Sequence, residues 1–243
     1  MNTRYENPGG RPLLLGHRGC RRCAPENTFE AFDLALQHGC DGFEFDVRRT
    51  ADGRNVICHD SKFGKLLVAS STFDLLSEDI ARPVRSLFRN SAQQQTFLPC
   101  FEQVLERYAQ RAFLDIELKV AGVEDAVVGL LHEQGDYERV VVSSFLPEVV
   151  ERVHALDPNV PSGYIFSNAR AMRRWRSLPV THVMPHCTLV TEKLVRDFHS
   201  AGKQVLVWTV NAPRDMQRMT QFGVDGIISD DTQLLSRTVR GQS

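Results

Sequence analysis

Short runs of apolar residues alternate with longer segments of helical periodicity along almost the whole 243-residue chain. The apolar runs have the length of buried strands, and the segments between them repeat apolar residues every three or four positions. Strict alternation of strand and helix favours a parallel sheet. Eight repeats in about 250 residues favour a closed (β/α)8 TIM barrel over an open α/β sheet. The predicted strands are residues 13–17, 42–47, 113–119, 139–144, 161–166, 181–186, 204–210 and 225–230.

One interval, residues 48–112, is too long for a simple strand-to-helix connection. It begins with Asp52-Gly53, a turn signal between two extended runs, which predicts a hairpin-like excursion after the second strand. We expect an insertion at about residues 60–98, followed by a helix in FEQVLERYAQR. No linker or low-complexity tract separates a second unit, so residues 1–243 are predicted to form a single domain.

The first helix is predicted to start at Asn27, because Glu30 follows at the spacing of a capping box.

The composition of the chain excludes two classes of protein, nucleic-acid-binding and membrane-spanning proteins. A net charge of −1 gives no general attraction to nucleic acid, and no stretch has the ~20 apolar residues of a membrane-spanning helix. The N-terminus lacks the pattern of a secretory signal, and six scattered cysteines are typical of free thiols. These features predict a cytoplasmic protein.

Charged residues inside the predicted strands are the informative exceptions to an apolar pattern. Glu44 and Asp46 share one face of the second strand, about 6.6 Å apart along the chain. Asp115, Glu117 and Lys119 share one face of the third. Carboxylates converging at the carboxyl ends of barrel strands repel one another unless a cation joins them. Oxygen ligands favour one hard divalent ion, Mg²⁺ or Ca²⁺, with Mn²⁺ a third candidate. The alternative is that Glu44, Asp46 and Glu117 merely pair with arginines at the rim.

Two histidines are expected beside these carboxylates. His17 ends the first strand and His59 lies in the excursion after the second, so both can act as general acid or base. Arg18 and Lys119 add positive charge. Three carboxylates, one divalent ion and two cations sum to +1, which suits a phosphodiester monoanion and predicts phosphoryl chemistry.

Cys20 and Cys23 form a CxxC in the stretch HRGCRRCAPENT. A zinc site needs further ligands at a suitable spacing, and the other cysteines are isolated in the sequence. A redox CxxC normally opens a helix, which here begins later. The pattern therefore favours a catalytic loop in which His17 and Arg18 are functional, with zinc binding or dithiol chemistry as the alternative. Oxidation of the pair, by distorting the loop, is a hypothetical means of inhibition.

The chain resembles the glycerophosphodiester phosphodiesterase family. The resemblance lies in HRG (17–19), APENT (24–28), the run from Glu44 to Asp60, LPCFEQVL (98–105), DIELK (115–119), WTVN (208–211) and GVDGIISD (223–230). It implies a (β/α)8 barrel that binds a metal through Glu44, Asp46 and Glu117, with His17 and His59 as the acid–base pair. It further implies that Arg18 and Lys119 contact phosphate and that Trp208 forms an aromatic pocket wall.

The implied reaction is metal-dependent hydrolysis of a glycerophosphodiester, such as glycerophosphocholine or glycerophosphoethanolamine, to sn-glycerol 3-phosphate and an alcohol. The sequence leaves open which histidine is the acid, whether water or the adjacent glycerol hydroxyl attacks, the headgroup, the metal and the oligomeric state. Residues after Asp60 depart from the family pattern. Two alternatives remain: a lysophospholipase D-like enzyme, favoured by an apolar entrance at 63–68 and 87–90, and a non-catalytic barrel used for binding.

Overall fold

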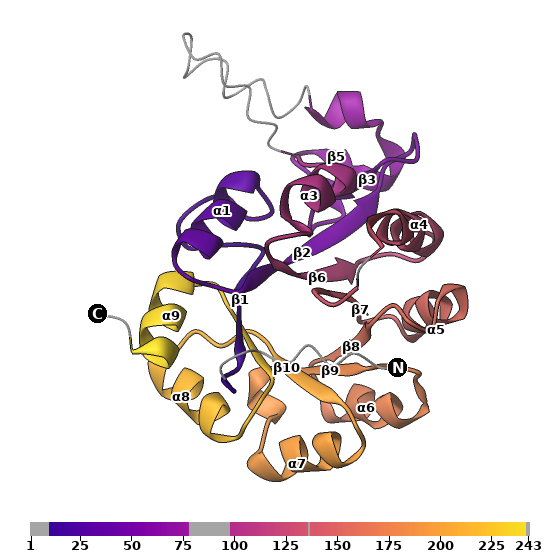
Figure 1. Ribbon diagram of the computed structural model, residues 1–243. Helices are drawn as coiled ribbons and strands as arrows, with labels where there is room; N and C mark the ends of the chain where they lie inside the picture. The colour runs from indigo at the N-terminus through magenta and orange to yellow at the C-terminus, as the bar shows by residue number, and fades with distance from the viewer. Residues whose placement is uncertain (1–9, 78–97, 136, 242–243) are drawn as a thin grey trace.

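The computed structural model describes residues 10–77, 98–135 and 137–241. Eight parallel strands within these residues form a closed barrel, because β1 (Leu13–His17) pairs with both β2 (Gly42–Arg49) and β11 (Gly226–Ser229) (Figure 1). This confirms the predicted (β/α)8 TIM barrel. Only β2 extends beyond its predicted run. The strands are β1 (Leu13–His17), β2 (Gly42–Arg49), β6 (Phe113–Leu118), β7 (Val140–Ser144), β8 (Ser162–Phe166), β9 (His182–Pro185), β10 (Gln204–Val207) and β11 (Gly226–Ser229).

Helices surround the barrel and cover the outer face of its strands (Figure 1). Their apolar faces pack against the outward-pointing strand residues in two large clusters, and a smaller cluster fills the barrel interior. The helices described are α1 (Phe29–Gln37), α3 (Phe101–Tyr108), α4 (Glu124–Gln134), α5 (Pro147–Leu156), α6 (Ala169–Met172), α7 (Glu192–Ser200), α8 (Pro213–Gln221) and α9 (Thr232–Arg240).

The alternation of side chains along β2 divides the outer core from the barrel interior. Phe43 and Phe45 are fully buried outside the barrel, where Phe43 stacks on Phe32 of α1 with ring centroids 4.2 Å apart. The residues between them, Glu44 and Asp46, therefore face inward. Burial of large aromatic side chains fixes this register, since a slip by one residue would move the acids to the helix-covered face.

Close packing of β2 on β6 depends on a glycine. Gly42 pairs with Phe113 in the parallel register, and a Cβ added to Gly42 would lie 1.8 Å from the Phe113 carbonyl oxygen. No side chain fits there. The two strands consequently meet closely at the beginning of a register that pairs Glu44 with Asp115 and Asp46 with Glu117.

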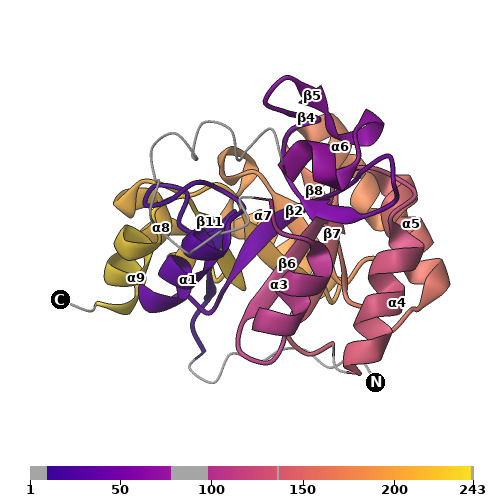
Figure 2. The ribbon, with the colours of Figure 1, turned by 90° about the horizontal axis from the view of Figure 1, so that it is seen from above.

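The predicted excursion after the second strand is a hairpin. β3 (Asn55–Ile57) pairs antiparallel with the end of β2, with Val47 opposite Ile57. A two-stranded sheet of β4 (Lys62–Phe63) and β5 (Leu66–Leu67) follows and stands at the upper edge of Figure 2. The first part of the predicted insertion at 60–98 thus forms a small separate sheet, and residues 78–97 lie outside the described residues.

The prediction that Asn27 caps the first helix is wrong. Thr28 is the N-cap of α1, and its hydroxyl oxygen accepts a hydrogen bond from the backbone N–H of Ala31 at 3.2 Å. Asn27 instead has a left-handed backbone with φ of 59°. This conformation, tolerated by asparagine, turns its side chain toward β2.

Candidate active site

Strand register places the predicted acidic residues in two adjacent rows. His17 of β1 lies opposite Glu44 of β2, which lies opposite Asp115 of β6. One pleat further on, Asp46 lies opposite Glu117. These positions are toward the carboxyl ends of the strands, where barrel enzymes build active sites. Three strands that are distant in sequence therefore bring their polar side chains into one patch of the barrel interior.

Glu44, Asp46 and Glu117 form a buried cluster, with one carboxylate oxygen from each within 4.8 Å of the others. Burial, together with the charges of Asp46 and Glu117, raises the pKa of Glu44 well above its ordinary value. Burial and the charge of Asp46 raise the pKa of Glu117 to about 7. The chain alone therefore stabilises the negative charges of Glu44 and Glu117 poorly.

Two oxygens of this cluster, Glu44 Oε1 and Asp46 Oδ1, are buried and accept no hydrogen bond. Unbonded buried carboxylate oxygens are costly, and several of them converging on one point are the donor set of a hard divalent cation. The residues present thus fit a divalent metal ion. Glu44, Asp46 and Glu117 could hold it, as the sequence predicted.

Arg18 and Lys119 also contact the acidic cluster. The Arg18 backbone N–H donates to Glu44 Oε2 at 3.0 Å, and its Nε lies 3.2 Å from Asp46 Oδ2. Lys119 Nζ donates to Glu117 Oε1 at 2.6 Å and lies 3.4 Å from Asp46 Oδ1. The acids therefore do form ion pairs, as the alternative to a metal site requires. These pairs do not replace a metal ion, because two cations cannot neutralise three carboxylates. The same two side chains are the fixed positive charges beside the cavity.

His17 is oriented by an aspartate from the opposite end of the sequence. Its Nδ1 lies 2.6 Å from Asp230 Oδ1, just after β11, and its Nε2 lies 3.9 Å from Glu44 Oε2. Asn211 Nδ2 donates to the second Asp230 oxygen at 2.6 Å. Burial raises the pKa of Asp230, but hydrogen bonds from His17 and Asn211 outweigh it and leave that pKa below its ordinary value. Asp230 thus fixes the ring with Nε2 toward the acidic cluster.

His59 has a similar arrangement on the other side. Its Nδ1 lies 2.8 Å from Asp60 Oδ1, and its carbonyl oxygen accepts hydrogen bonds from the Arg48 guanidinium at 2.9 and 2.7 Å. Partial burial lowers the pKa of His59 below its ordinary value, although Asp46 and Asp60 act in the opposite direction. The ring is therefore oriented by Asp60, while Arg48 of β2 holds the backbone of His59.

One cavity of about 270 Å³ is lined by both histidines, by two of the clustered acids and by both cations: His17, His59, Glu44, Glu117, Arg18 and Lys119. Its opposite wall is apolar and includes Phe145, Met184 and Trp208. Trp208 Nε1 donates to the Met184 carbonyl oxygen at 2.9 Å, and its ring meets Phe145 edge-on with centroids 5.4 Å apart. Trp208 thus lies in the wall of this cavity together with Phe145, and a role for either in substrate binding stays a prediction.

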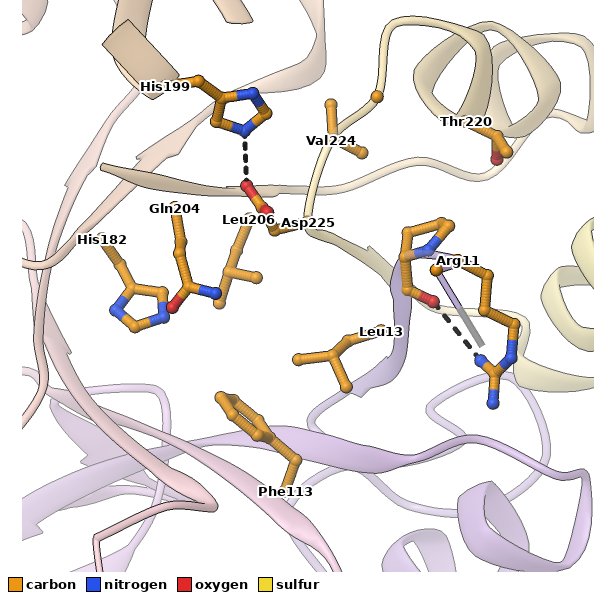
Figure 3. Close-up of a pocket in the computed structure, with 13 residues that line it drawn as sticks. Arg11, Leu13, Phe113, His182, His199, Gln204, Leu206, Thr220, Val224 and Asp225 are labelled. Atoms are coloured by element: carbon orange, nitrogen blue, oxygen red, sulfur yellow. Dashed lines mark hydrogen bonds and ion pairs between the residues drawn. The ribbon is translucent and has the colours of Figure 1, made fainter. Parts of the chain in front are cut away.

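A larger cavity, of about 840 Å³, lies at the amino ends of the strands (Figure 3). It is lined by residues such as Leu13, Phe113, His182 and Gln204, and His199 pairs with Asp225 at its edge. No carboxylate cluster lies there among the described residues. The smaller cavity, at the carboxyl ends, is the one that borders the acidic cluster and is therefore the candidate active site.

The residues of the site that the sequence did not predict include Asn27, Phe145 and Asp230. Asn27 Nδ2 donates to Asp46 Oδ2 at 2.8 Å, whereas the capping pattern assigned it to the helix. Asp230 ends the motif GVDGIISD, but its partner is 213 residues away in sequence. Phe145 follows β7 with no pattern that marks it. Only the position of Asp230 at a strand end could have indicated its role.

The prediction that all six cysteines are free thiols is wrong. Cys20 and Cys23 form a disulfide, and the free cysteines are Cys40, Cys58, Cys100 and Cys187. With this bond present, Arg18 contacts Glu44 and Asp46. Inhibition through oxidation of the pair stays a hypothesis.

Comparison with known proteins assigns the family. Residues 17–234 match the profile of the Glycerophosphoryl diester phosphodiesterase family. Glycerophosphodiester phosphodiesterases from Caldanaerobacter subterraneus subsp. tengcongensis and Bacillus altitudinis are 29% and 30% identical to this chain. The first match covers 94% of this chain and 98% of the relative, and the second covers 89% and 94%.

Solved structures agree with this assignment. An Oleispira antarctica phosphodiesterase in complex with the product sn-glycerol-3-phosphate matches with a TM-score of 0.79 at 26% identity, over 95% of this chain and 97% of that one. A glycerophosphodiester phosphodiesterase from Parabacteroides distasonis shares the fold, with a TM-score of 0.80 at 24% identity over 96% and 99% of the two chains. With the barrel, the acidic cluster and the two histidines, these matches identify the chain as an enzyme of the glycerophosphodiester phosphodiesterase family.

Proposed function

We propose that this chain hydrolyses glycerophosphodiesters, such as glycerophosphocholine or glycerophosphoethanolamine, to sn-glycerol 3-phosphate and an alcohol. The observation that carries the proposal is the combination of a buried three-carboxylate cluster with two aspartate-bound histidines around one cavity. The cavity is small and half apolar, which suits a short diester. The product bound to the Oleispira antarctica relative supports glycerol 3-phosphate as the retained half.

In the proposed reaction, the phosphodiester group lies between the acidic cluster and the histidines. When bound by Glu44, Asp46 and Glu117, a divalent cation, Mg²⁺ or Ca²⁺ or alternatively Mn²⁺, supplies Lewis-acid stabilisation of the phosphoryl oxygens. Arg18 and Lys119 contact the acids and line the cavity, so in this proposal they also donate hydrogen bonds to the phosphoryl oxygens.

His17 and His59 move the protons. One accepts a proton from the attacking hydroxyl, of water or of the adjacent glycerol carbon, and the other donates a proton to the leaving alkoxide. Asp230 and Asp60 each occupy the Nδ1 of their histidine, so Nε2 is the nitrogen that exchanges the proton in both cases. Trp208 and Phe145 contact the carbon-rich part of the diester.

Lysophospholipids are a second candidate substrate class, favoured by the apolar wall. Of the apolar entrance predicted at 63–68, Leu67 is 48% exposed, but Phe63 and Leu66 pack against a buried cluster around Val56. Residues 87–90 lie outside the described residues. The described residues of this region thus expose little apolar surface for binding a long acyl chain. Glycerophosphodiesters therefore remain the first candidate substrates.

The test is to incubate the protein with glycerophosphocholine, glycerophosphoethanolamine or lysophosphatidylcholine, with each metal or with EDTA. We expect metal-dependent release of glycerol 3-phosphate from the first two. His17→Ala and His59→Ala should each lower turnover at least ~10²-fold, whereas His132→Ala, an exposed histidine on α4, should not. Release of lysophosphatidate alone would favour the lysophospholipase D alternative, and no turnover of any diester would favour a binding barrel.

No helix of the described residues is long and apolar enough to cross a membrane. The cytoplasmic location expected from the sequence relied partly on six free thiols, and the Cys20–Cys23 disulfide removes that support. A cytoplasmic location is therefore proposed on composition and charge alone.

A further inference from the structure

Three metal-ligating side chains lie together outside the active site: Cys20, Cys23 and His38. Their ligand atoms are all within 4.8 Å of one another, and this is the second such group within the described residues. Cys20 is fully buried, Cys23 is exposed and His38 is half-buried. The group therefore reaches from the protein interior to solvent, so that an ion could enter through Cys23.

His38 is the ligand that the sequence could not supply. It lies at the C-cap of α1, whereas the cysteines lie in the loop after β1. The loop is held against the helix by a hydrogen bond of 2.8 Å from the Cys20 N–H to the Ala31 carbonyl oxygen. The CxxC lacked further ligands in sequence, and the fold provides one from the adjacent helix.

The environment of His38 resembles that of a metal-binding histidine. Its Nδ1 lies 2.7 Å from the Thr232 hydroxyl oxygen at the start of α9. When Nδ1–H donates there, the lone pair of Nε2 is free, and such an outer hydrogen bond is the usual way in which a ligating imidazole is oriented. In that tautomer, Nε2 is the nitrogen of His38 that could bind a cation.

We propose that, once the disulfide is reduced, Cys20, Cys23 and His38 bind one thiophilic divalent cation of the Zn²⁺ class. A dithiol reductant gives two electrons and two protons, so that the S–S bond breaks, both sulfurs become thiols and the reductant closes to its own disulfide. A phosphine gives the two electrons and becomes a phosphine oxide, with water supplying its oxygen and the two protons. Binding of the cation then releases two thiol protons, and two thiolates, one neutral imidazole and one divalent ion sum to zero charge. Three protein ligands leave one tetrahedral position for water.

The two metal sites differ in donor type and therefore in the ion each prefers. The active-site cluster offers only carboxylate oxygens, which favour hard ions, while sulfur and imidazole favour zinc-like ions. The oxidised pair has no thiolate to offer. The oxidation state of Cys20 and Cys23 thus determines whether the second metal site can form. In a reducing compartment the two thiols would be available to a cation.

The test uses Co²⁺ as a spectroscopic probe on the full chain, reduced with a phosphine and kept in excess Mg²⁺ to fill the oxygen site. Only a thiolate ligand gives a near-ultraviolet charge-transfer band with Co²⁺. We expect a band in the reduced protein that saturates at one ion per chain and disappears when Zn²⁺ displaces Co²⁺. Protein oxidised with diamide should give no band.

Matched variants identify the ligands. Cys23→Ser should abolish the band, and His38→Gln should weaken Co²⁺ binding at least tenfold, with circular dichroism confirming that both are folded. Cys187→Ser and His132→Gln, which change a free cysteine and an exposed histidine elsewhere, should bind as the parent does. The proposal is overturned if the reduced, folded protein gives no band, if the disulfide resists the reductant, or if the band survives Cys23→Ser. None of these outcomes depends on phosphodiesterase activity.

Discussion

Asp230 orients the ring of His17 through one hydrogen bond, of 2.6 Å between Asp230 Oδ1 and His17 Nδ1. The aspartate holds one ring nitrogen so that the other faces Glu44, 3.9 Å away. An equivalent pair, Asp225 with His199, lies at the opposite end of the barrel at 2.8 Å. The two pairs share their chemistry but differ in their distance from the acidic cluster, so one serves as a control for the other.

Asp230→Asn should lower kcat by roughly 10- to 100-fold with little change in KM, since the amide cannot stabilise a protonated His17. Steady-state kinetics on a glycerophosphodiester measure both constants. Asp225→Asn should leave kcat within about twofold of the parent. An unchanged kcat in Asp230→Asn would show that the contact has no part in catalysis.

At the start of α1, two adjacent residues have different roles: one stabilises the helix, and the other contacts the acidic cluster. Thr28 caps the helix, and Asn27 donates to Asp46 in the acidic cluster. The capping pattern predicted the helix almost correctly, but it could not predict the left-handed backbone of Asn27 that redirects its side chain. That backbone is set by the loop, where the Asn27 N–H donates to the Arg18 carbonyl oxygen at 3.1 Å.

Thr28→Ala should lower the free energy of unfolding by about 1 kcal/mol and leave kcat unchanged, because a cap is lost and the site is not. Asn27→Ala should weaken metal activation and turnover by roughly tenfold or more, because Asp46 loses its hydrogen bond. Urea unfolding and metal titration of activity measure the two effects. Equal effects of both substitutions on turnover would contradict this division.

In the strands, the sequence alone was enough to predict which face each side chain occupies. Alternation along β2 and β6 predicted that Glu44, Asp46 and Glu117 face one side, and their register confirms it. Phe145, by contrast, is placed by a turn after β7, and it meets Trp208 only because the barrel closes. Patterns of period two report on which face a residue lies, but they carry no information about which distant loop it meets.

At the scale of the whole molecule, barrel closure is what assembles the site. β1 pairs with β11, which brings Asp230 to His17 across 213 residues. The same closure places Thr232 beside His38, 194 residues away. The sequence predicted the closed barrel from the number of its repeats, but not these contacts, because they depend on the stagger of the strands.

The amino end of the barrel has its own titratable group. His182 is only 5% exposed and lines the larger cavity (Figure 3). Burial lowers the pKa of His182 to about 4, so it is neutral in the folded protein at pH values where an unfolded histidine is charged. As the pH falls from about 6.5 to 4, the unfolded state takes up this proton first, and stability decreases across that window.

His182→Gln removes this dependence. The parent should lose up to about 3 kcal/mol of unfolding free energy between those pH values because of this group, with a slope of at most ~1.4 kcal/mol per pH unit. The variant should have a shallower slope, and His132→Gln, at an exposed position, should not. Urea unfolding at a series of pH values measures the slopes. Parallel curves for the parent and His182→Gln would contradict the assignment.

We propose that a divalent cation held by Glu44, Asp46 and Glu117 is required for hydrolysis of glycerophosphodiesters by this chain. The most direct measurement is release of glycerol 3-phosphate from glycerophosphocholine by EDTA-treated protein as Mg²⁺ is added back, for the parent and for Glu117→Gln. We expect no release without metal, saturable recovery in the parent, and at least ~10²-fold lower turnover or much weaker activation in the variant. Full turnover in EDTA would show that the reaction needs no divalent cation. An identical Mg²⁺ response in Glu117→Gln would show that Glu117 does not hold it.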